Sequence, residues 1–406
     1  MRVVCSDPRP IPPTLSPAER VAGASNNRHN RRMNRVDYLW QRPDWPNWRY
    51  DLAALTAPLT AVSHAQGRLL GRLADVGFDL RNHACLAALT DDVVKTSEIE
   101  GEHLNVESVR SSIARRLGVD IGALAPADRH VEGVVSMVLD ATANCAKPLT
   151  NPRLFGWHAA LFPTGYSNHV KVAIGQWRND ADGPMQVVSG RVERPTVHYE
   201  APPASGLAHE MAQFLRWVEH DARDPALIKA GLAHLWFVTI HPFDDGNGRV
   251  GRAIGDMLLA RADGSPDRFY SLSAQIMRDR KGYYSVLEET QKRSMDVTPW
   301  ISWFIKSVGL AVEQADRRLD AVLFKARCWV QWGEIPMNPR QKKVINRVLD
   351  GFDGNLTTKK WAAIGKCSHD AALRDINELV AVGVLRKSGA SGRSTSYNIV
   401  DGGTTH

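Results

Sequence analysis

The chain has 406 residues, of which 43% are hydrophobic and 23% are charged, and its formal net charge is +7. This composition is that of an ordinary globular protein, and the length predicts two to three domains. No apolar run is long enough to span a membrane, and the N-terminus lacks the apolar core of a signal peptide, so we expect a cytoplasmic protein without a membrane partner.

The cysteines and the charge distribution limit the kinds of bound metal, disulfide and partner that we expect. Five cysteines lie far apart and form no CxxC pair, which argues against a zinc site and against a disulfide framework. Residues 1–35 carry seven Lys and Arg against two acids, and residues 338–400 carry eleven against five. Basic ends on a near-neutral body leave room for a nucleic-acid partner, although a solvated charged face is the simpler explanation.

The N-terminal segment is predicted to gain order only gradually. Residues 1–35 hold several Pro, Asn, Ser and Arg residues, and we expect a mobile basic tail there. Order is expected to begin near Tyr38, where Trp40, Trp45 and Trp48 fall within nine residues. Such a cluster favours packing in a core, with a ligand platform as the alternative.

A helical module is predicted to follow the tryptophans. Apolar residues recur at helical spacing from residue 51 to about 118, so residues 36–125 are expected to form this module. Within it, Thr96 and Glu100 are four residues apart and share one helix face, and Gly101 follows them. Without further context, this is a polar helix segment that ends at a glycine.

A change of periodicity predicts a β-hairpin in an otherwise helical protein. Residues 185–190 and 196–199 have the pattern of two short strands, with turn residues Gly190, Arg191 and Pro195 between them. An ordinary surface hairpin is the alternative to a functional one.

The segment from His241 to Arg252 concentrates reactive side chains. An apolar run precedes it and an apolar-periodic run follows it, so we predict a helix, a loop and a second helix. Loop amides at a helix N-terminus bind phosphate oxygens, arginines add bidentate donors, a carboxylate can hold Mg²⁺, and a neutral histidine can accept a proton. These roles fall on His241, Asp245, Gly246, Asn247, Gly248, Arg249 and Arg252. The sequence therefore predicts a site for phosphoryl or nucleotidyl transfer.

The same segment resembles the signature of the Fic family, HxFx(D/E)GNGRxxR, at every fixed position. The resemblance implies transfer of AMP from ATP to a Ser, Thr or Tyr hydroxyl of a target protein, with release of pyrophosphate. It assigns His241 as the general base and Asp245 as the ligand of a Mg²⁺ that bridges the phosphates. It also makes Gly246 to Gly248 the anion hole, while Arg249 and Arg252 hold the β- and γ-phosphates.

Three further segments gain meaning from this resemblance. The segment around Thr96, Glu100 and Gly101 fits the inhibitory pattern (S/T)xxxE(G/N), in which the glutamate pairs with the second motif arginine, here Arg252. The tryptophan-rich stretch resembles an N-terminal module of one subset of the family. The hairpin resembles the flap that clamps a target peptide by strand addition. The expected nucleotide-site residues of this flap are Val188, Ser189 and Gly190.

The adenosine contacts are expected after the motif. Tyr283 and Tyr284 lie on a helical pattern and could belong to the core. In related Fic proteins, a Tyr-Tyr pair and a polar amide seven residues later contact adenosine, and Gln291 occupies that place. The family more often has Asn there. Thr298 then opens another helix as an N-cap followed by proline.

The catalytic domain is predicted to span residues 126–325, and a separate domain to span residues 336–400. In the latter, helices are expected to begin near Asn338, Thr357 and Ser368, followed by two strands joined by a turn at residues 388–393. This arrangement resembles a winged helix-turn-helix domain, and both DNA binding and protein contact remain open for it.

We therefore predict a mainly α protein, with a Fic helical core, a small β-hairpin flap and a C-terminal winged helix-turn-helix domain. The expected activity is protein adenylylation with ATP and Mg²⁺, inhibited by Glu100. The target is unidentified, the chain itself is one candidate, and a homodimer stays open. The alternatives are removal of AMP, transfer of UMP or phosphocholine, or a nucleotide-sensing DNA-binding regulator. A sensor needs neither His241 nor Asp245, so their presence argues against that last alternative.

Overall fold

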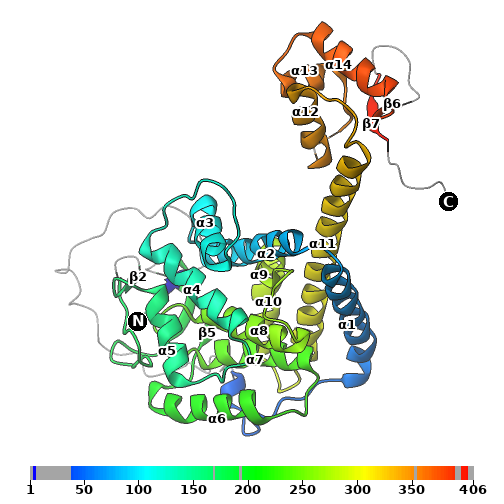
Figure 1. The fold of residues 1–406 in the computed structure, drawn as a ribbon. Helices are drawn as coiled ribbons and strands as arrows, with labels where there is room; N and C mark the ends of the chain where they lie inside the picture. The colour runs from blue at the N-terminus through cyan, green and yellow to red at the C-terminus, as the bar shows by residue number, and fades with distance from the viewer. Residues whose placement is uncertain are drawn as a thin grey trace. The chain divides into compact units, whose positions relative to one another are not determined.

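The computed structural model describes residues 3–5, 38–167, 170–191, 194–351, 354–388 and 395–400. It divides into two compact units, residues 1–315 and 316–406 (Figure 1). Helices dominate both units, which confirms the predicted mainly α class. Within the described part of the chain, no helix is both long and apolar enough to cross a membrane.

The helices of the first unit begin and end at local sequence signals. Asp51 caps the first helix by accepting a hydrogen bond from the Ala54 amide at 3.1 Å, and Gly118 ends the third in a left-handed conformation. The helices are α1 (Leu52–Ala74), α2 (Phe78–Ile99), α3 (Val106–Leu117), α4 (Arg129–Ala143), α5 (Asn151–Leu161), α6 (Leu207–His220), α7 (Ala226–Ile240), α8 (Asn247–Asp263), α9 (Leu272–Arg278) and α10 (Arg280–Gln291). Short 3-10 turns lie at Leu39–Gln41 and Ala204–Gly206.

Helices α7 and α8 form the centre of this unit (Figure 1). Helix α7 is apolar around most of its circumference, which is the composition of a helix buried on all sides. At Gly251 of α8 an added Cβ would stand 2.8 Å from Cγ1 of Val238, so the close α7–α8 approach needs a glycine. Helices α2 and α4 also pack against α8. The motif therefore lies between the two most buried helices.

The predicted hairpin is present and longer than expected. Strands β4 (Gln186–Arg191) and β5 (Arg194–Glu200) pair antiparallel, with a bulge between Val187 and Val188. Gly190, Arg191 and Pro195, expected in the turn, belong instead to the strands, where Gly190 pairs with Pro195 and Arg191 with Arg194. A separate small pair is formed by β2 (Tyr166–Ser167) and β3 (Val170–Lys171).

Part of the expected N-terminal tail is a strand. Residues Val3–Cys5 form β1, which pairs in parallel with β4 and makes the hairpin a three-stranded sheet. The mobile tail predicted for residues 1–35 is therefore not seen at these three residues, because β4 offers an open edge for pairing. The rest of that prediction lies outside the described residues.

The N-terminal tryptophans pack against the core, as the packing interpretation expects. The rings of Trp45 and Trp48 meet Trp236 of α7 at centroid distances of 6.2 and 5.8 Å. Trp40 Nε1 donates to the carbonyl of Glu200 at 2.8 Å. The segment thereby joins α7 to the hairpin.

The second unit has its own core and the element order that the sequence predicts. Helix α11 (Thr298–Gln331) begins at the expected Thr298, and Cys328 of its last turn and Trp332 just after it belong to this core. The unit therefore begins at Asp316, earlier than the expected residue 336. The following elements are α12 (Pro339–Leu349), α13 (Thr358–Gly365), α14 (His369–Ala381), β6 (Leu385–Lys387) and β7 (Tyr397–Ile399). Strands β6 and β7 pair antiparallel, and most of the predicted turn between them lies outside the described residues.

Candidate active site

The motif loop is held in shape by its own side chains. Helix α7 ends at Ile240 and is capped by His241, whose φ of 52° is left-handed and uncommon for a residue with a Cβ. The Asn247 side chain accepts from the Phe243 amide at 2.9 Å and donates to the Phe243 carbonyl at 2.8 Å. The Asn247 side chain thus closes the loop, and its backbone amide is the part left for the predicted anion hole of residues 246–248.

Phe243 anchors the motif loop to the aromatic side chains around it. Its fully buried ring stacks on His158 at a centroid distance of 4.1 Å and also meets Trp177 at 5.1 Å. Burial of a phenylalanine ring stabilises a protein by about 1.5–3 kcal/mol relative to exposure. Phe243 therefore fixes the loop by packing.

Arg178 is a site residue that the sequence did not reveal. Its buried side chain donates from Nε to the His241 carbonyl at 2.8 Å and from Nη2 to the Pro202 carbonyl at 2.6 Å. Its amide also donates to the Pro242 carbonyl at 2.9 Å. One arginine thus fixes the backbone on which His241 stands. A single arginine 63 residues before the motif carries no spacing signal.

The geometry gives His241 the properties of a base. Burial, and to a lesser extent Arg178, lower the pKa of His241 to about 4, although the residue is only half-buried. The imidazole is therefore neutral at pH 7. Nδ1 lies 3.2 Å from the Val238 carbonyl, which can only accept, so Nδ1 carries the proton and Nε2 keeps the free lone pair.

Asp245 stands at the entrance to α8. Its Oδ1 accepts from the Gly246 amide at 2.5 Å, and its Oδ2 accepts from the Ser167 hydroxyl of β2. Gly246, the N-cap residue of α8, has a φ of 79°, which favours glycine, and it supplies no side-chain cap to the first turn of the helix. The amides at this helix end are therefore directed toward a space where an anion would be stabilised.

Two buried arginines flank that space. Arg249 donates from Nη1 to Glu102 Oε2 at 2.5 Å, and its guanidinium lies 5.1 Å from the centre of the Phe162 ring. Arg252 donates from Nε to the Thr96 hydroxyl at 2.7 Å and from Nη2 to the Thr96 carbonyl at 2.9 Å. Among the described residues, Arg249 Nε and Arg252 Nη1 are buried without a hydrogen-bond partner. A buried N–H group without a hydrogen-bond acceptor costs folding free energy, so both atoms indicate a missing acceptor.

The Glu100 carboxylate occupies this anion space. Arg252 Nη2 donates to Glu100 Oε1 at 2.7 Å, with side-chain exposures of 2% for the arginine and 23% for the glutamate. A Cβ added at Gly248 would stand 2.1 Å from the same oxygen, so the carboxylate lies directly against the first turn of α8. Burial alone would lower the pKa of Arg252, but Glu100 and nearby tyrosines outweigh it and raise that pKa. Gly101, with a φ of 85°, turns the chain away after α2.

The three residues expected near adenosine lie in different environments. The Tyr283 hydroxyl meets His234 Nε2 at 3.1 Å inside the core, and the buried Gln291 donates to the Thr239 hydroxyl at 3.2 Å. Tyr284 is half-buried, and its hydroxyl donates to the Ile99 carbonyl at 3.4 Å. In this arrangement Tyr284 is the most accessible of the three for a ligand.

The flap residues connect to α10. Val188 is buried, and Gly190 has a φ of 93°. The Ser189 hydroxyl lies 2.6 Å from His198 Nε2, and His198 Nδ1 lies 2.8 Å from Glu288 Oε2 of α10. His198 and Glu288 were not predicted, and they tie the flap to the helix that carries Tyr284.

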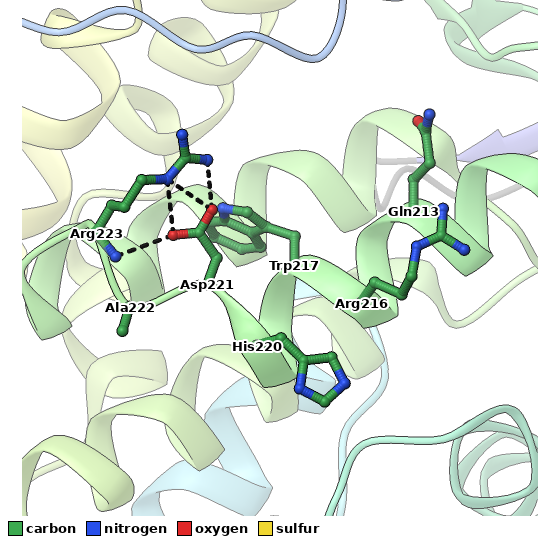
Figure 2. A pocket seen from close by; sticks show the side chains of 7 residues that line it. All are labelled: Gln213, Arg216, Trp217, His220, Asp221, Ala222 and Arg223. Carbon is green, nitrogen blue, oxygen red and sulfur yellow. Dashed lines mark hydrogen bonds and ion pairs between the residues drawn. The ribbon is translucent and has the colours of Figure 1, made fainter.

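A shallow depression at the end of α6 lies apart from all these residues. Its volume is about 540 Å³, and its lining is Gln213, Arg216, Trp217, His220, Asp221, Ala222 and Arg223 (Figure 2). Figure 2 shows the exposed Arg223 side chain against the Asp221 carboxylate. None of the motif residues contributes to it, so we do not assign the chemistry to this depression.

Two family models match the chain. Residues 148–259 match the model described as Fic/DOC family, and residues 38–119 match one described as a domain of unknown function (DUF4172). The first range contains the motif, Arg178 and the hairpin, and the second contains Glu100 and Glu102.

Named relatives share parts of the chain. It is 46% identical over 182 residues to "Protein adenylyltransferase Fic" of Drosophila ananassae, which is 43% of this chain and 32% of the relative. It is 30% identical over 122 residues to "Uridine 5'-monophosphate transferase" of Xanthomonas campestris pv. campestris, which is 28% of this chain and 21% of the relative. The chain thus spans a third or less of the length of these relatives. A Fic family protein from Desulfovibrio desulfuricans G20 aligns with 86% of this chain and 97% of its own, at 19% identity and a TM-score of 0.49.

Proposed function

Because residues 148–259 belong to the Fic/DOC family, we propose that this chain is a protein adenylyltransferase that moves AMP from ATP to a protein hydroxyl. One observation carries the proposal. Two buried arginines, each with an unpartnered donor, flank an uncapped helix N-terminus beside a neutral histidine. Phosphate groups supply the acceptors that these donors lack.

His241 is the proposed general base. Its free Nε2 accepts the proton of the Ser, Thr or Tyr hydroxyl of the target. The hydroxyl oxygen attacks the α-phosphorus, a new oxygen–phosphorus bond forms, and the bond to the β-phosphate oxygen breaks to release pyrophosphate. Arg178 keeps the imidazole in place by holding the His241 carbonyl.

The phosphates are proposed to lie against α8. The amides of its first turn face the phosphate oxygens, and Arg249 and Arg252 balance the charge of the β- and γ-phosphates. Little covalent chemistry is asked of the protein in such a transfer, so positioning and charge stabilisation supply most of the rate. Tyr283, Tyr284 and Gln291 remain the proposed adenosine side of the site, with Tyr284 as the direct contact.

A divalent cation fits this site only together with the nucleotide. Among the described residues, no group of three His, Cys, Asp or Glu side chains could hold a metal ion. Asp245 offers one carboxylate at the entrance to α8, and Mg²⁺ is commonly held by one carboxylate plus substrate phosphates. When bound, Mg²⁺ would neutralise phosphate charge, and Asp245 would be its protein ligand.

Glu100 is proposed to inhibit the enzyme. Its carboxylate pairs with Arg252 and lies against Gly248, where a phosphate oxygen would lie. Bound ATP then lacks one arginine and meets a negative charge, which misplaces its α-phosphate. Thr96 holds Arg252 from the other side through its hydroxyl and carbonyl.

Partners follow from the same proposal. The β4–β5 hairpin is proposed to hold the target segment by strand pairing, with Val188, Ser189 and Gly190 nearest the nucleotide. The second unit, with its helices followed by a β6–β7 hairpin, is proposed as a winged helix-turn-helix that binds DNA. A homodimer is compatible with both.

UMP transfer is the second candidate function, since one relative is named "Uridine 5'-monophosphate transferase". Intact-mass spectrometry of the Glu100→Gly variant after incubation with Mg²⁺ and ATP, or with UTP, distinguishes the two. We expect a mass increase of one AMP with ATP and a much smaller yield with UTP. A UMP adduct with UTP and none with ATP would reverse the assignment. No adduct on the chain or on proteins of a cell extract with either nucleotide would contradict transfer itself.

A further inference from the structure

A second glutamate reaches the site beside the one that the sequence pattern marks. Glu102 Oε2 accepts from Arg249 Nη1 at 2.5 Å, with side-chain exposures of 30% for the glutamate and 1% for the arginine. Arg249 is the other motif arginine, so each of the two arginines of the anion site is paired with its own glutamate. The two acids come from the same short segment.

The backbone after α2 brings both carboxylates to one place. Gly101 is left-handed, and the Glu102 amide donates back to the Ser97 carbonyl at 3.0 Å. This turn keeps Glu102 at the C-terminal end of α2. Negative side chains are disfavoured at that end by the helix dipole. Two glutamates there are therefore stabilised by the arginines that they contact rather than by their own helix.

His130 shares Glu102 with Arg249. Its Nε2 lies 3.2 Å from Glu102 Oε2, the same oxygen that Arg249 contacts, and it comes from the first turn of α4. Burial alone would raise the pKa of Glu102, but the contacts with His130 and Arg249 outweigh it and lower that pKa. Glu102 is thus an ionised carboxylate with two competing donors on one oxygen.

We propose that Glu102 is a second acidic positioning residue, which holds Arg249 away from the nucleotide, while His130 weakens that hold by sharing the carboxylate. The inference rests on the proposed nucleotide site. It means that removing Glu100 frees only Arg252 and leaves Arg249 held. A nucleotide gains the use of Arg249 only by displacing Glu102 from it. Displacing Glu102 weakens the binding of the β- and γ-phosphates, so the affinity for ATP is lowered and the affinity for AMP is not.

Binding measurements test this without catalysis. Calorimetric titration of a non-transferable ATP analogue and of AMP, each with Mg²⁺, would be compared in the Glu100→Gly background. Glu102→Gln, which keeps the shape and removes the charge, should tighten ATP-analogue binding about tenfold, within the usual range of coupling between sites, and leave AMP nearly unchanged. His130→Gln should weaken analogue binding severalfold, because Arg249 then competes with a weaker donor for the carboxylate.

The matched control is Glu98→Gln, since Glu98 lies on the same helix end and pairs with Lys95 instead. It should leave both affinities unchanged, and Glu102→Asp, which keeps the charge, should stay close to the background. Equal or weaker analogue binding in Glu102→Gln overturns the inference, because Glu102 would then orient Arg249 for phosphate. A change of the same sign in Glu102→Gln and His130→Gln overturns it too. Absence of any nucleotide binding in the background protein would instead contradict the proposed function, and this inference with it.

Discussion

Replacing Glu100 by glycine tests the inhibition most directly. The residue caps the end of α2 and accepts one charge-assisted hydrogen bond, 2.7 Å long, from a nearly fully buried arginine. A hydrogen bond to a charged group contributes about 1.5–3 kcal/mol. Loss of this contact, and of the carboxylate against Gly248, should therefore raise the transfer rate by a factor of about 10 to 150.

The assay is the initial rate of AMP incorporation into the chain or a target, followed with labelled ATP. Glu98→Gly is the matched control, because it removes a glutamate from the same last turn without touching Arg252. Arg252→Ala breaks the same pair but should lower the rate, since it also removes a phosphate ligand and leaves Thr96 and Glu100 unpaired. A folded Glu100→Gly variant that works at the parent rate would refute the inhibition. Equal losses of transfer rate in Glu100→Gly and Arg252→Ala would mean that the Glu100–Arg252 ion pair only supports the structure.

The remaining predictions concern the base, the metal, acid stability and the second unit. His241→Ala should keep ATP binding while transfer falls by about two to four orders of magnitude, and equal transfer rates would exclude it as the base. Asp245→Ala should lower transfer and its dependence on Mg²⁺, and an unchanged magnesium titration would make it a structural residue. Burial lowers the pKa of His158 to about 4 and of His234 to about 3. As the pH falls, these histidines bind protons in the unfolded chain before they do so in the folded protein. Denaturant titrations should therefore show the free energy of unfolding falling from pH 6.5 toward 4, by about 1.4 kcal/mol per pH unit for each histidine. A free energy of unfolding that does not change over that pH range would mean that both histidines already bind protons in the folded protein. The chain should bind duplex DNA at low salt, less so after Lys359→Glu, and no binding at low salt by fluorescence anisotropy would favour a protein-contact role for the second unit.

The parts of the site that the sequence predicted are the contiguous ones. His241, Asp245 and both arginines follow a fixed spacing, and the helix boundaries around them come from apolar periodicity and capping residues. The same local signals located the hairpin and the start of α12, where Asn338 and Gln341 form a capping box. Contacts within one helix or strand can be predicted from the sequence because the spacing of residues determines which side chains are neighbours.

The parts that were missed depend on contacts between distant segments. Arg178, Ser167 and Glu102 reach the motif from 63, 78 and 147 residues away, and no periodicity connects them to it. Glu102 directly follows the inhibitory pattern, and the left-handed turn at Gly101 brings it back to α8. Asn247 shows a different limit, because its place in the motif was clear but its use as a loop clamp depends on the fold of the loop.

The proposed inhibition predicts which side of the site has to move for activation. The motif loop is fixed by the Asn247 side chain, by Arg178 and by the buried ring of Phe243, so its displacement would break several buried contacts at once. Glu100, by contrast, lies at the cap of α2, is partly exposed, and meets the site through its side chain. The carboxylate lies at the positive end of α8, where an incoming phosphate would gain the same electrostatic stabilisation. Under the proposed inhibition, nucleotide and Glu100 compete for one anion position, and a signal that pulls the end of α2 away would free that position without disturbing His241.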